Sequence, residues 1–263
     1  MYFVFQRRLF ALLACFSCVT AHAHFPYLAP ASFEPVRNWV SLEAAFAEKF
    51  FLPEAKFDLA TFVVTTPDGS ERAPTELQTT RSRTLIDDEL KSDGTYRYST
   101  GQRFGAVFHS YELNGKTENS RDANFVLPEG AVLKAHFQSV TQADTFVSKG
   151  KLNTTALKAR STGLEIEFTS HPNDLYVGQP IKARLLSDGR SLPASTVQLH
   201  RTGIDHQAVA PLSVKTNATG EFEVTPSQAG VYVLVAKHRA NSPAGAKAPI
   251  YSYTSTTVLE VVE

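Results

Sequence analysis

The chain has 263 residues, and its 26 basic and 26 acidic side chains balance to a formal net charge of zero. This balance gives no electrostatic reason to expect a nucleic acid or an anionic membrane surface as a partner. Apart from one N-terminal run, no apolar stretch approaches the roughly 20 residues of a transmembrane helix. The chain beyond that run is therefore expected not to insert into a membrane.

The first 23 residues have the features of a secretion signal. Two arginines precede an apolar run from Leu9 to Val19, and Ala21-His22-Ala23 fits the small-x-small cleavage rule. We expect residues 1–23 to be removed, so that a periplasmic protein begins at His24. Two alternatives stay open, namely an uncleaved N-terminal anchor and lipoprotein processing at Cys15.

Both cysteines and the single methionine lie within this signal segment. Removal of 23 residues from 263 would leave 240 residues without a disulfide, a thiol nucleophile or a sulfur ligand. A chain of that length can bury an ordinary hydrophobic core, which must then hold the fold.

The remaining sequence alternates short β-rich runs with turn residues. Apolar alternation predicts a strand from about Trp39 to Phe46, followed by an irregular stretch around Pro53. The run ATFVVTTPDGSER predicts a strand and a Pro-Asp-Gly turn. GTYRYST and FGAVFHSYELNGK predict two successive strands, and AVLKAHFQSVTQADTFVS predicts a longer one.

A second series of strands follows residue 160. The runs predicted as strands are Leu164–Thr169, Ile181–Leu186, Thr196–His200, Glu221–Val224, Val231–Lys237 and Tyr251–Val261. Turn residues rich in glycine, asparagine and aspartate separate them, as is typical of antiparallel β-sandwiches.

The two halves share a Gly-x-Tyr motif that enters a late strand, with the tyrosines at Tyr96 and Tyr232. In immunoglobulin-like sandwiches a tyrosine at this place returns its hydroxyl to the backbone as a corner. We therefore predict an all-β fold of two tandem immunoglobulin-like antiparallel β-sandwich domains, 24–155 and 160–263. The polar run SKGKLNTTALKARST is the expected linker.

No sequence motif supports an enzyme. HExxH, GxSxG, a Walker loop and a GxGxxG after a strand are all absent from the sequence. We expect no enzyme activity and no organic cofactor. Of the eight histidines, His22 would leave with the signal, and the other seven contain no pair at the i, i+4 spacing of a helical metal site.

His24 is distinguished by its expected position at the new N-terminus. An N-terminal histidine offers both its α-amine and its ring Nδ1 to one cation, a chelate that an internal histidine cannot form. The α-amine has an ordinary pKa of about 8, so binding displaces its proton at little cost near neutral pH. Nitrogen donors without sulfur suit Cu(II), Ni(II), Co(II) and Zn(II), and one or two further ligands are required.

Two other histidines could supply these further ligands. His171 lies in the turn TSHPNDLY ahead of a strand, and His238 ends the apolar run VYVLVAKH at a sheet rim. For each, a turn or cap role is the alternative. The remaining four are predicted to be half-buried packing residues within strands (His109, His136) or solvated residues beside a turn (His200, His206).

Five segments resemble the bacterial domain of unknown function 4198 family. They are HFPYLAPASFEP, VSLEAAFAEKFFLPEAKFD, TYRYSTGQRFG, SHPNDLYVGQPIKARLLSDGRSLP and AGVYVLVAKHRANSPAGAKAPIYSYTSTTVLEV. Members are commonly labelled periplasmic components of cobalt or nickel transport. The resemblance implies two all-β domains, a periplasmic location, and His24, His171 and His238 as candidate metal ligands. LLSDGRSLPASTVQLHR and the strands after it are also similar to carboxypeptidase regulatory-like, transthyretin-type domains.

In an immunoglobulin-like topology, the loop carrying His171 and the strand end carrying His238 are expected at opposite ends. His24 with His238 at the domain junction is therefore the favoured pair.

The first functional hypothesis is a periplasmic, non-enzymatic protein that holds a divalent transition metal (Ni, Co, Zn or Cu) or a metal chelate. It would pass this cargo to a membrane transporter. The alternative is a structural or interaction module that binds an outer-membrane receptor or another periplasmic protein. A third hypothesis, a copper oxidative enzyme with an N-terminal histidine brace, needs a second histidine opposite His24, and the resemblance does not support it.

Overall fold

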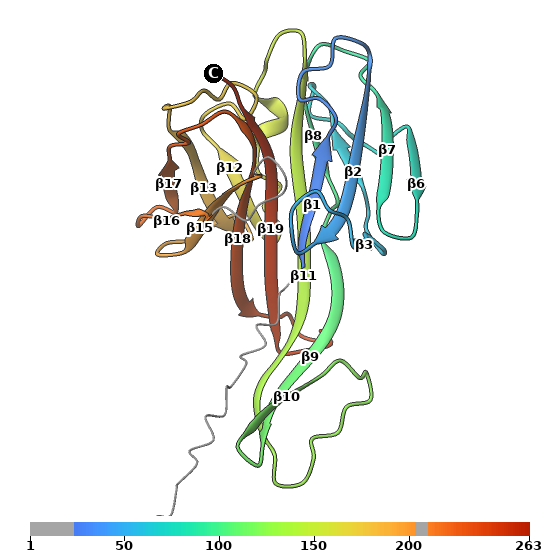
Figure 1. The fold of residues 1–263 in the computed structure, drawn as a ribbon, viewed down its shortest axis with the longest axis vertical. Coiled ribbons are helices and arrows are strands. Elements are labelled where there is room, and N and C mark those ends of the chain that lie inside the picture. Colours follow the sequence, from blue (N-terminus) through green and yellow to red (C-terminus); the bar gives the residue numbers. More distant parts are fainter. Residues whose placement is uncertain (1–23, 203–209) are drawn as a thin grey trace, which may run out of the picture.

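The computed structural model describes residues 24–202 and 210–263. The expected signal segment, residues 1–23, and His206 lie outside these residues. The described chain consists of β-strands and one 3₁₀ turn, Thr155–Leu157, so the all-β prediction is confirmed (Figure 1). Within the described residues there is no helix with the length and apolar character needed to span a bilayer.

The N-terminal half is a sandwich of two sheets. Its strands are β1 (Phe25–Pro30), β2 (Trp39–Ala47), β3 (Ala55–Lys56), β4 (Val63–Thr65), β5 (Glu71–Arg72), β6 (Glu76–Thr79), β7 (Thr84–Glu89), β8 (Gly94–Ser99), β9 (Arg103–Leu113), β10 (Lys116–Ser120) and β11 (Val132–Lys149). One sheet has the order β1-β2-β7-β6, and the facing sheet contains β4, β8 and β11 in that order. In immunoglobulin lettering these are strands A-B-E-D and C-F-G, so the fold class follows from strand order alone.

The C-terminal half repeats this plan. Its strands are β12 (Leu164–Phe168), β13 (Ile181–Ser187), β14 (Arg190–Ser191), β15 (Thr196–Arg201), β16 (Leu212–Lys215), β17 (Glu221–Val224), β18 (Gly230–Asn241) and β19 (Ile250–Val261). Strands β12, β13 and β17 face β16-β15-β18-β19, which corresponds to A-B-E against C′-C-F-G. Leu185, Leu199, Leu234 and Leu259 are buried in the core between these sheets.

Both predicted tyrosine corners are confirmed. The Tyr96 hydroxyl donates to the Ser92 carbonyl at 2.8 Å and accepts from the Ser92 N–H at 2.9 Å. The Tyr232 hydroxyl donates to the Gln228 carbonyl at 2.7 Å. Each tyrosine lies in strand F of its sandwich and ties the strand to the loop that leads into it.

The two halves are joined edge to edge by a parallel strand pair. Gln138–Thr145 of β11 pairs with Tyr251–Val258 of β19, and this pairing makes one continuous ten-stranded sheet. The prediction of antiparallel sandwiches therefore holds within each half but not at the joint. Each sandwich presents its last strand as an open edge, and closing one edge against the other satisfies the unpaired backbone groups of both.

A buried ionic cluster lies beside this joint. The Arg97 guanidinium contacts Asp144 at 2.7 Å and Glu165 at 3.4 Å, and all three side chains are at most 3% exposed. Arg160, from the expected linker, contacts Asp144 at 3.0 Å and donates to Ser99 at 2.8 Å. The ion pair and the hydrogen bond of Arg160 therefore hold the predicted linker against the N-terminal sandwich.

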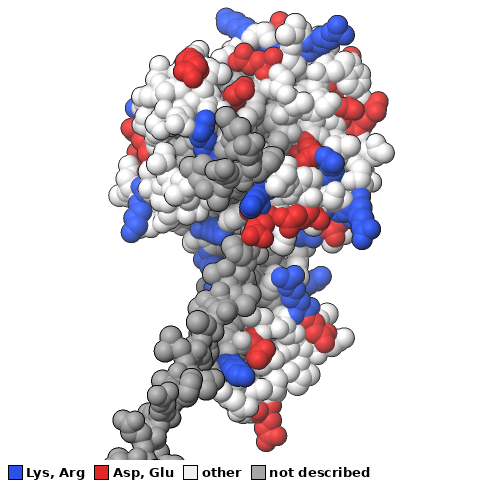
Figure 2. Space-filling model, viewed as in Figure 1, with Lys and Arg blue, Asp and Glu red and all other residues white. Residues whose placement is uncertain are grey.

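A long hairpin extends beyond the N-terminal sandwich, and we call residues 103–137 the arm. Strand β9 pairs with the first part of β11, β10 adds an edge to β9, and the arm projects at the lower end of the molecule (Figure 1). Figure 2 shows positive and negative side chains mixed over the visible face of both the body and the arm. This distribution agrees with the balanced composition.

Candidate functional site

His24 lies immediately before β1 and forms a polar pair with Glu54. Its Nε2 is 2.6 Å from Glu54 Oε2, and the two side chains are 48% and 41% exposed. Glu54 Oε1 also accepts the backbone N–H of Glu48 at 2.9 Å. The Glu48 N–H and the His24 ring together lower the pKa of Glu54 below its usual value, so its carboxylate is ionised at neutral pH.

The ionised carboxylate determines the tautomer of His24. A carboxylate only accepts hydrogen bonds, so Nε2 must carry the hydrogen that it donates to Glu54. In the neutral ring the lone pair then resides on Nδ1. Nδ1 is the ring nitrogen that can chelate an ion together with the α-amine of the same residue, and metal-binding histidines are commonly oriented by a carboxylate in this way.

An aromatic cluster lies next to this pair. The Phe25 ring is 5.5 Å from the Phe50 ring and 5.9 Å from the His200 ring, and the Lys237 ammonium lies 4.4 Å from the Phe25 ring centre. Burial, and then the charge of Lys237, lower the pKa of His200. The prediction that His200 is solvated is wrong, because its ring packs against both Phe25 and Phe50.

His238 faces away from His24. The side chain of Lys237 reaches Phe25 of β1, and successive residues of a strand point to opposite faces, so His238 faces the other side of the sheet. There it lies across from Tyr253, a member of the C-terminal core. Burial lowers the pKa of His238, although Asp188 opposes this effect. The expected pairing of His24 with His238 is therefore not formed in the described structure.

His171 uses both ring nitrogens, Nδ1 within its own turn and Nε2 in contacts with the N-terminal half. Its Nδ1 accepts the Asn173 backbone N–H at 3.1 Å, and its Nε2 lies 3.0 Å from both Thr95 Oγ1 and the Asn153 carbonyl. Because Nδ1 accepts, Nε2 carries the hydrogen and donates. These contacts connect the loop after β12 to strand β8 of the N-terminal sandwich.

His171→Ala is expected to lower the free energy of unfolding by about 1–3 kcal/mol, because it leaves buried polar partners unsatisfied. It should leave metal binding unchanged. Urea unfolding and calorimetric titration of the same preparation check both statements. Loss of ion binding at unchanged stability would instead identify His171 as a ligand.

The three candidate histidines do not converge on one point. Among residues 24–202 and 210–263, no three side chains of the types His, Cys, Asp and Glu form a group that could hold a metal ion. A site at His24 would therefore depend on Nδ1 together with the α-amine that the expected cleavage would free, which is not a side-chain group.

The structure brings two histidines of the arm together as a pair. His109 of β9 lies directly opposite His136 of β11, with ring centres 4.3 Å apart and planes 28° from parallel. Burial, and then the neighbouring His136, lower the pKa of His109. The prediction that each is a half-buried residue within a strand is confirmed. The two residues lie opposite each other only because of the register between β9 and β11. This register contains two irregularities that the sequence does not reveal.

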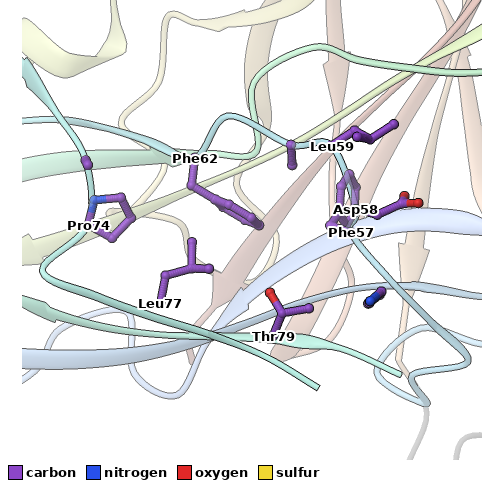
Figure 3. Close-up of a pocket in the computed structure, with 10 residues that line it drawn as sticks. Phe57, Asp58, Leu59, Phe62, Pro74, Leu77 and Thr79 are labelled. Atoms are coloured by element: carbon purple, nitrogen blue, oxygen red, sulfur yellow. The ribbon is translucent and has the colours of Figure 1, made fainter. Parts of the chain in front are cut away.

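The N-terminal sandwich also has an apolar hollow of about 310 Å³ between the loop after β3 and strand β6 (Figure 3). Phe57, Phe62, Pro74 and Leu77 supply much of its wall. None of the candidate histidines lines it. The hollow therefore adds nothing to the chemistry of the His24 pair.

The chain belongs to the family described as "Domain of unknown function (DUF4198)", whose model matches residues 21–240. No functionally curated protein matches the chain.

The solved structures with a weak likeness to this chain include the following three. The D0-D1 domain of intimin is 11% identical, with 90% of this chain and 97% of that chain covered and a TM-score of 0.24. A tetra-tandem repeat in the extending region of a large adhesion protein is 9% identical (90% and 74% covered, TM-score 0.23). A marsupial T cell receptor is 8% identical (90% and 74% covered, TM-score 0.20). Likenesses this weak carry no functional information.

Proposed function

We propose that this member of the family is a periplasmic, non-enzymatic binding protein for a divalent transition metal (Ni, Co, Zn or Cu) or a small metal chelate. It would hand this cargo to a membrane uptake system. The observation that carries the proposal is the His24–Glu54 pair, with Nε2 and Oε2 at 2.6 Å. The pair is exposed, as a site that loads and releases an ion must be.

The chemistry follows from the expected cleavage after Ala23. Cleavage there gives His24 a free α-amine, and this amine and Nδ1 would then hold the ion in a chelate. Glu54 would not touch the ion, but would accept the Nε2 hydrogen and keep Nδ1 unprotonated. Two protein nitrogens leave other coordination positions for water or for the ligands of a chelate, which suits a protein that passes its ion on.

His171 and His238 would join this site only after rearrangement. Both ring nitrogens of His171 are already used, Nδ1 by the Asn173 N–H of its own turn and Nε2 by the N-terminal half. His238 lies across from Tyr253, on the other face of β18. We therefore place the primary ligands in His24 alone.

Glu54→Ala is expected to weaken Ni(II) or Cu(II) binding by about 10- to 100-fold, the usual cost of removing a carboxylate that orients a metal-binding histidine. Calorimetric titration of the secreted protein measures the affinity. The matched control is Glu118→Ala in β10, another exposed glutamate, which should bind as tightly as the wild type. Equal affinity of Glu54→Ala and wild type would refute the role of Glu54.

The transport role and the preference for cobalt or nickel rest on the family resemblance alone. Growth of a deletion strain on limiting nickel or cobalt, with and without the gene, tests that part separately from metal binding. The resemblance of the C-terminal half to carboxypeptidase regulatory-like, transthyretin-type domains concerns fold and supports no activity.

A second candidate function is a module that binds an outer-membrane or periplasmic protein. Exposed apolar side chains on the arm favour it, because Val126, Val132 and Leu133 are 82%, 57% and 44% exposed. Replacement of Val126 and Val132 by aspartate should abolish capture of such a partner from a periplasmic extract and leave metal binding unchanged. Unchanged capture would count against this function.

A further inference from the structure

We propose that His109 and His136 on the arm form a second transition-metal site, independent of His24. The site would take up Cu(II), Zn(II) or Ni(II) through one imidazole nitrogen from each ring. Its position on the arm separates it in sequence and in fold from the N-terminal strand.

The strand register brings the two histidines together. His136 and His109 are paired residues of the antiparallel strands β11 and β9. Side chains directly opposite one another have Cβ atoms about 4.5–5.5 Å apart and share one face of the sheet. The ring centres are 4.3 Å apart. The terminal side-chain torsion of histidine is soft, so the rings can turn one nitrogen each toward a common ion without moving the backbone.

One nitrogen of the pair has no partner. Nδ1 of His109 is buried, and no hydrogen-bond partner for it exists within the described chain. A buried polar atom without a partner is costly and calls for an explanation, such as an ion. Coordination of an ion would give this nitrogen the partner that it lacks.

Aromatic packing on both faces holds the pair in place. On one face the Phe125 ring stacks on His109 at 4.3 Å, so that His109 lies between Phe125 and His136. On the other face the Phe108 and Phe137 rings stack at 5.1 Å. Arginines cap this second stack at each end, Arg121 over Phe108 and Arg239 over Phe137. The pair therefore lies in a packed part of the arm.

His136 also borders a space where the coordination shell could be completed. His136 lines a hollow of about 560 Å³ together with Asn241 at the end of β18 and Ser242 in the turn that follows it. Oxygen atoms or water could occupy further positions there. Lys247 lines the same hollow, and its ammonium would repel a bare dication. Lys247→Gln is therefore expected to tighten binding.

The donor set determines the order of affinities. Two imidazole nitrogens without sulfur follow the general series for divalent ions, so Cu(II) should bind more tightly than Ni(II) or Zn(II). Ca(II) and Mg(II) prefer oxygen ligands and should not bind here.

Native mass spectrometry with added Cu(II) tests the site. The protein used is the secreted chain extended by one alanine before His24, which removes the N-terminal chelate. We expect one bound ion in this protein, and none after His136→Phe, which keeps an aromatic ring in the stack but removes both nitrogens. His109→Phe serves as the second variant, and melting curves establish that each variant is folded.

Two results would overturn the proposal. One is retention of the ion by folded His136→Phe and His109→Phe proteins, and the other is the absence of a bound ion in the alanine-extended protein with both histidines intact. Because all these proteins lack the N-terminal chelate, the outcome is independent of the function proposed for His24. The unextended protein with His136→Phe reports on His24 alone.

Discussion

Asp144→Asn is expected to lower the free energy of unfolding by about 3–5 kcal/mol, the usual cost of removing one partner from a buried ion pair. The Asp144 carboxylate forms ion pairs with the guanidinium groups of Arg97 at 2.7 Å and Arg160 at 3.0 Å, and its side chain is only 3% exposed. Without its charge, the guanidinium of Arg97 keeps Glu165 as its remaining anion at 3.4 Å. Because the cluster fastens the linker to the N-terminal sandwich, the variant should also loosen the joint between the halves.

Urea unfolding followed by circular dichroism measures this loss. Asp93→Asn is the matched control, because Asp93 is 67% exposed and meets Lys149 at 3.4 Å. An exposed pair of this kind contributes at most about 1 kcal/mol. If the two variants were equally stable, the cluster would not hold the joint.

The second large effect is a loss of stability in acid. Burial alone would raise the pKa of Asp144, but the charges of Arg97 and Arg160 outweigh it and hold the pKa at about 2. The unfolded chain takes up this proton at about pH 3.9, whereas the folded chain does so only near pH 2. The stabilisation is therefore present above about pH 4 and is lost as the pH falls to 2, an effect of about 2 kcal/mol.

Urea unfolding at a series of pH values between 5 and 2 checks this statement. The wild type should lose stability steeply over about pH 4 to 2, and Asp144→Asn should show a flatter dependence. A second buried carboxylate acts in the same direction. The pKa of Asp88 is lowered because hydrogen bonds from Arg72, Tyr98 and Thr75 outweigh its burial. Identical pH profiles for wild type and variant would exclude Asp144 as a source of acid sensitivity.

Much of the fold could be predicted from local patterns. The strand predicted from about Trp39 to Phe46 is β2, and the run predicted at Glu221–Val224 is β17. Alternating burial and turn residues are local properties, which a sequence displays directly. The two tyrosine corners were predictable for the same reason, because each bonds a residue four positions earlier.

Features that depend on distant contacts could not be predicted. Strand β1 contains Pro26 and Pro30, which argue against a strand, yet it is accommodated at a sheet edge. Strand β16, Leu212–Lys215, is only four residues long and largely exposed. The parallel pairing of β11 with β19 joins segments more than 100 residues apart, and no local pattern specifies which open edges meet.

The same distinction applies to the candidate site. His24 could be selected as a candidate ligand from its position after the expected cleavage point, which is visible in the sequence. Its partner Glu54 is 30 residues away in an irregular stretch, so only the structure could identify it. His238 could be placed at a strand end, but its face relative to His24 depends on how β1 packs against β18.

The most direct test is intact-mass measurement of the secreted protein, followed by native mass spectrometry with Ni(II) and Cu(II) in the His136→Phe background. We expect a chain that begins at His24 and retains one ion, and loss of that ion when one alanine precedes His24. A chain that begins elsewhere, or an extended chain that binds the ion equally well, would contradict a metal site built on the N-terminal histidine.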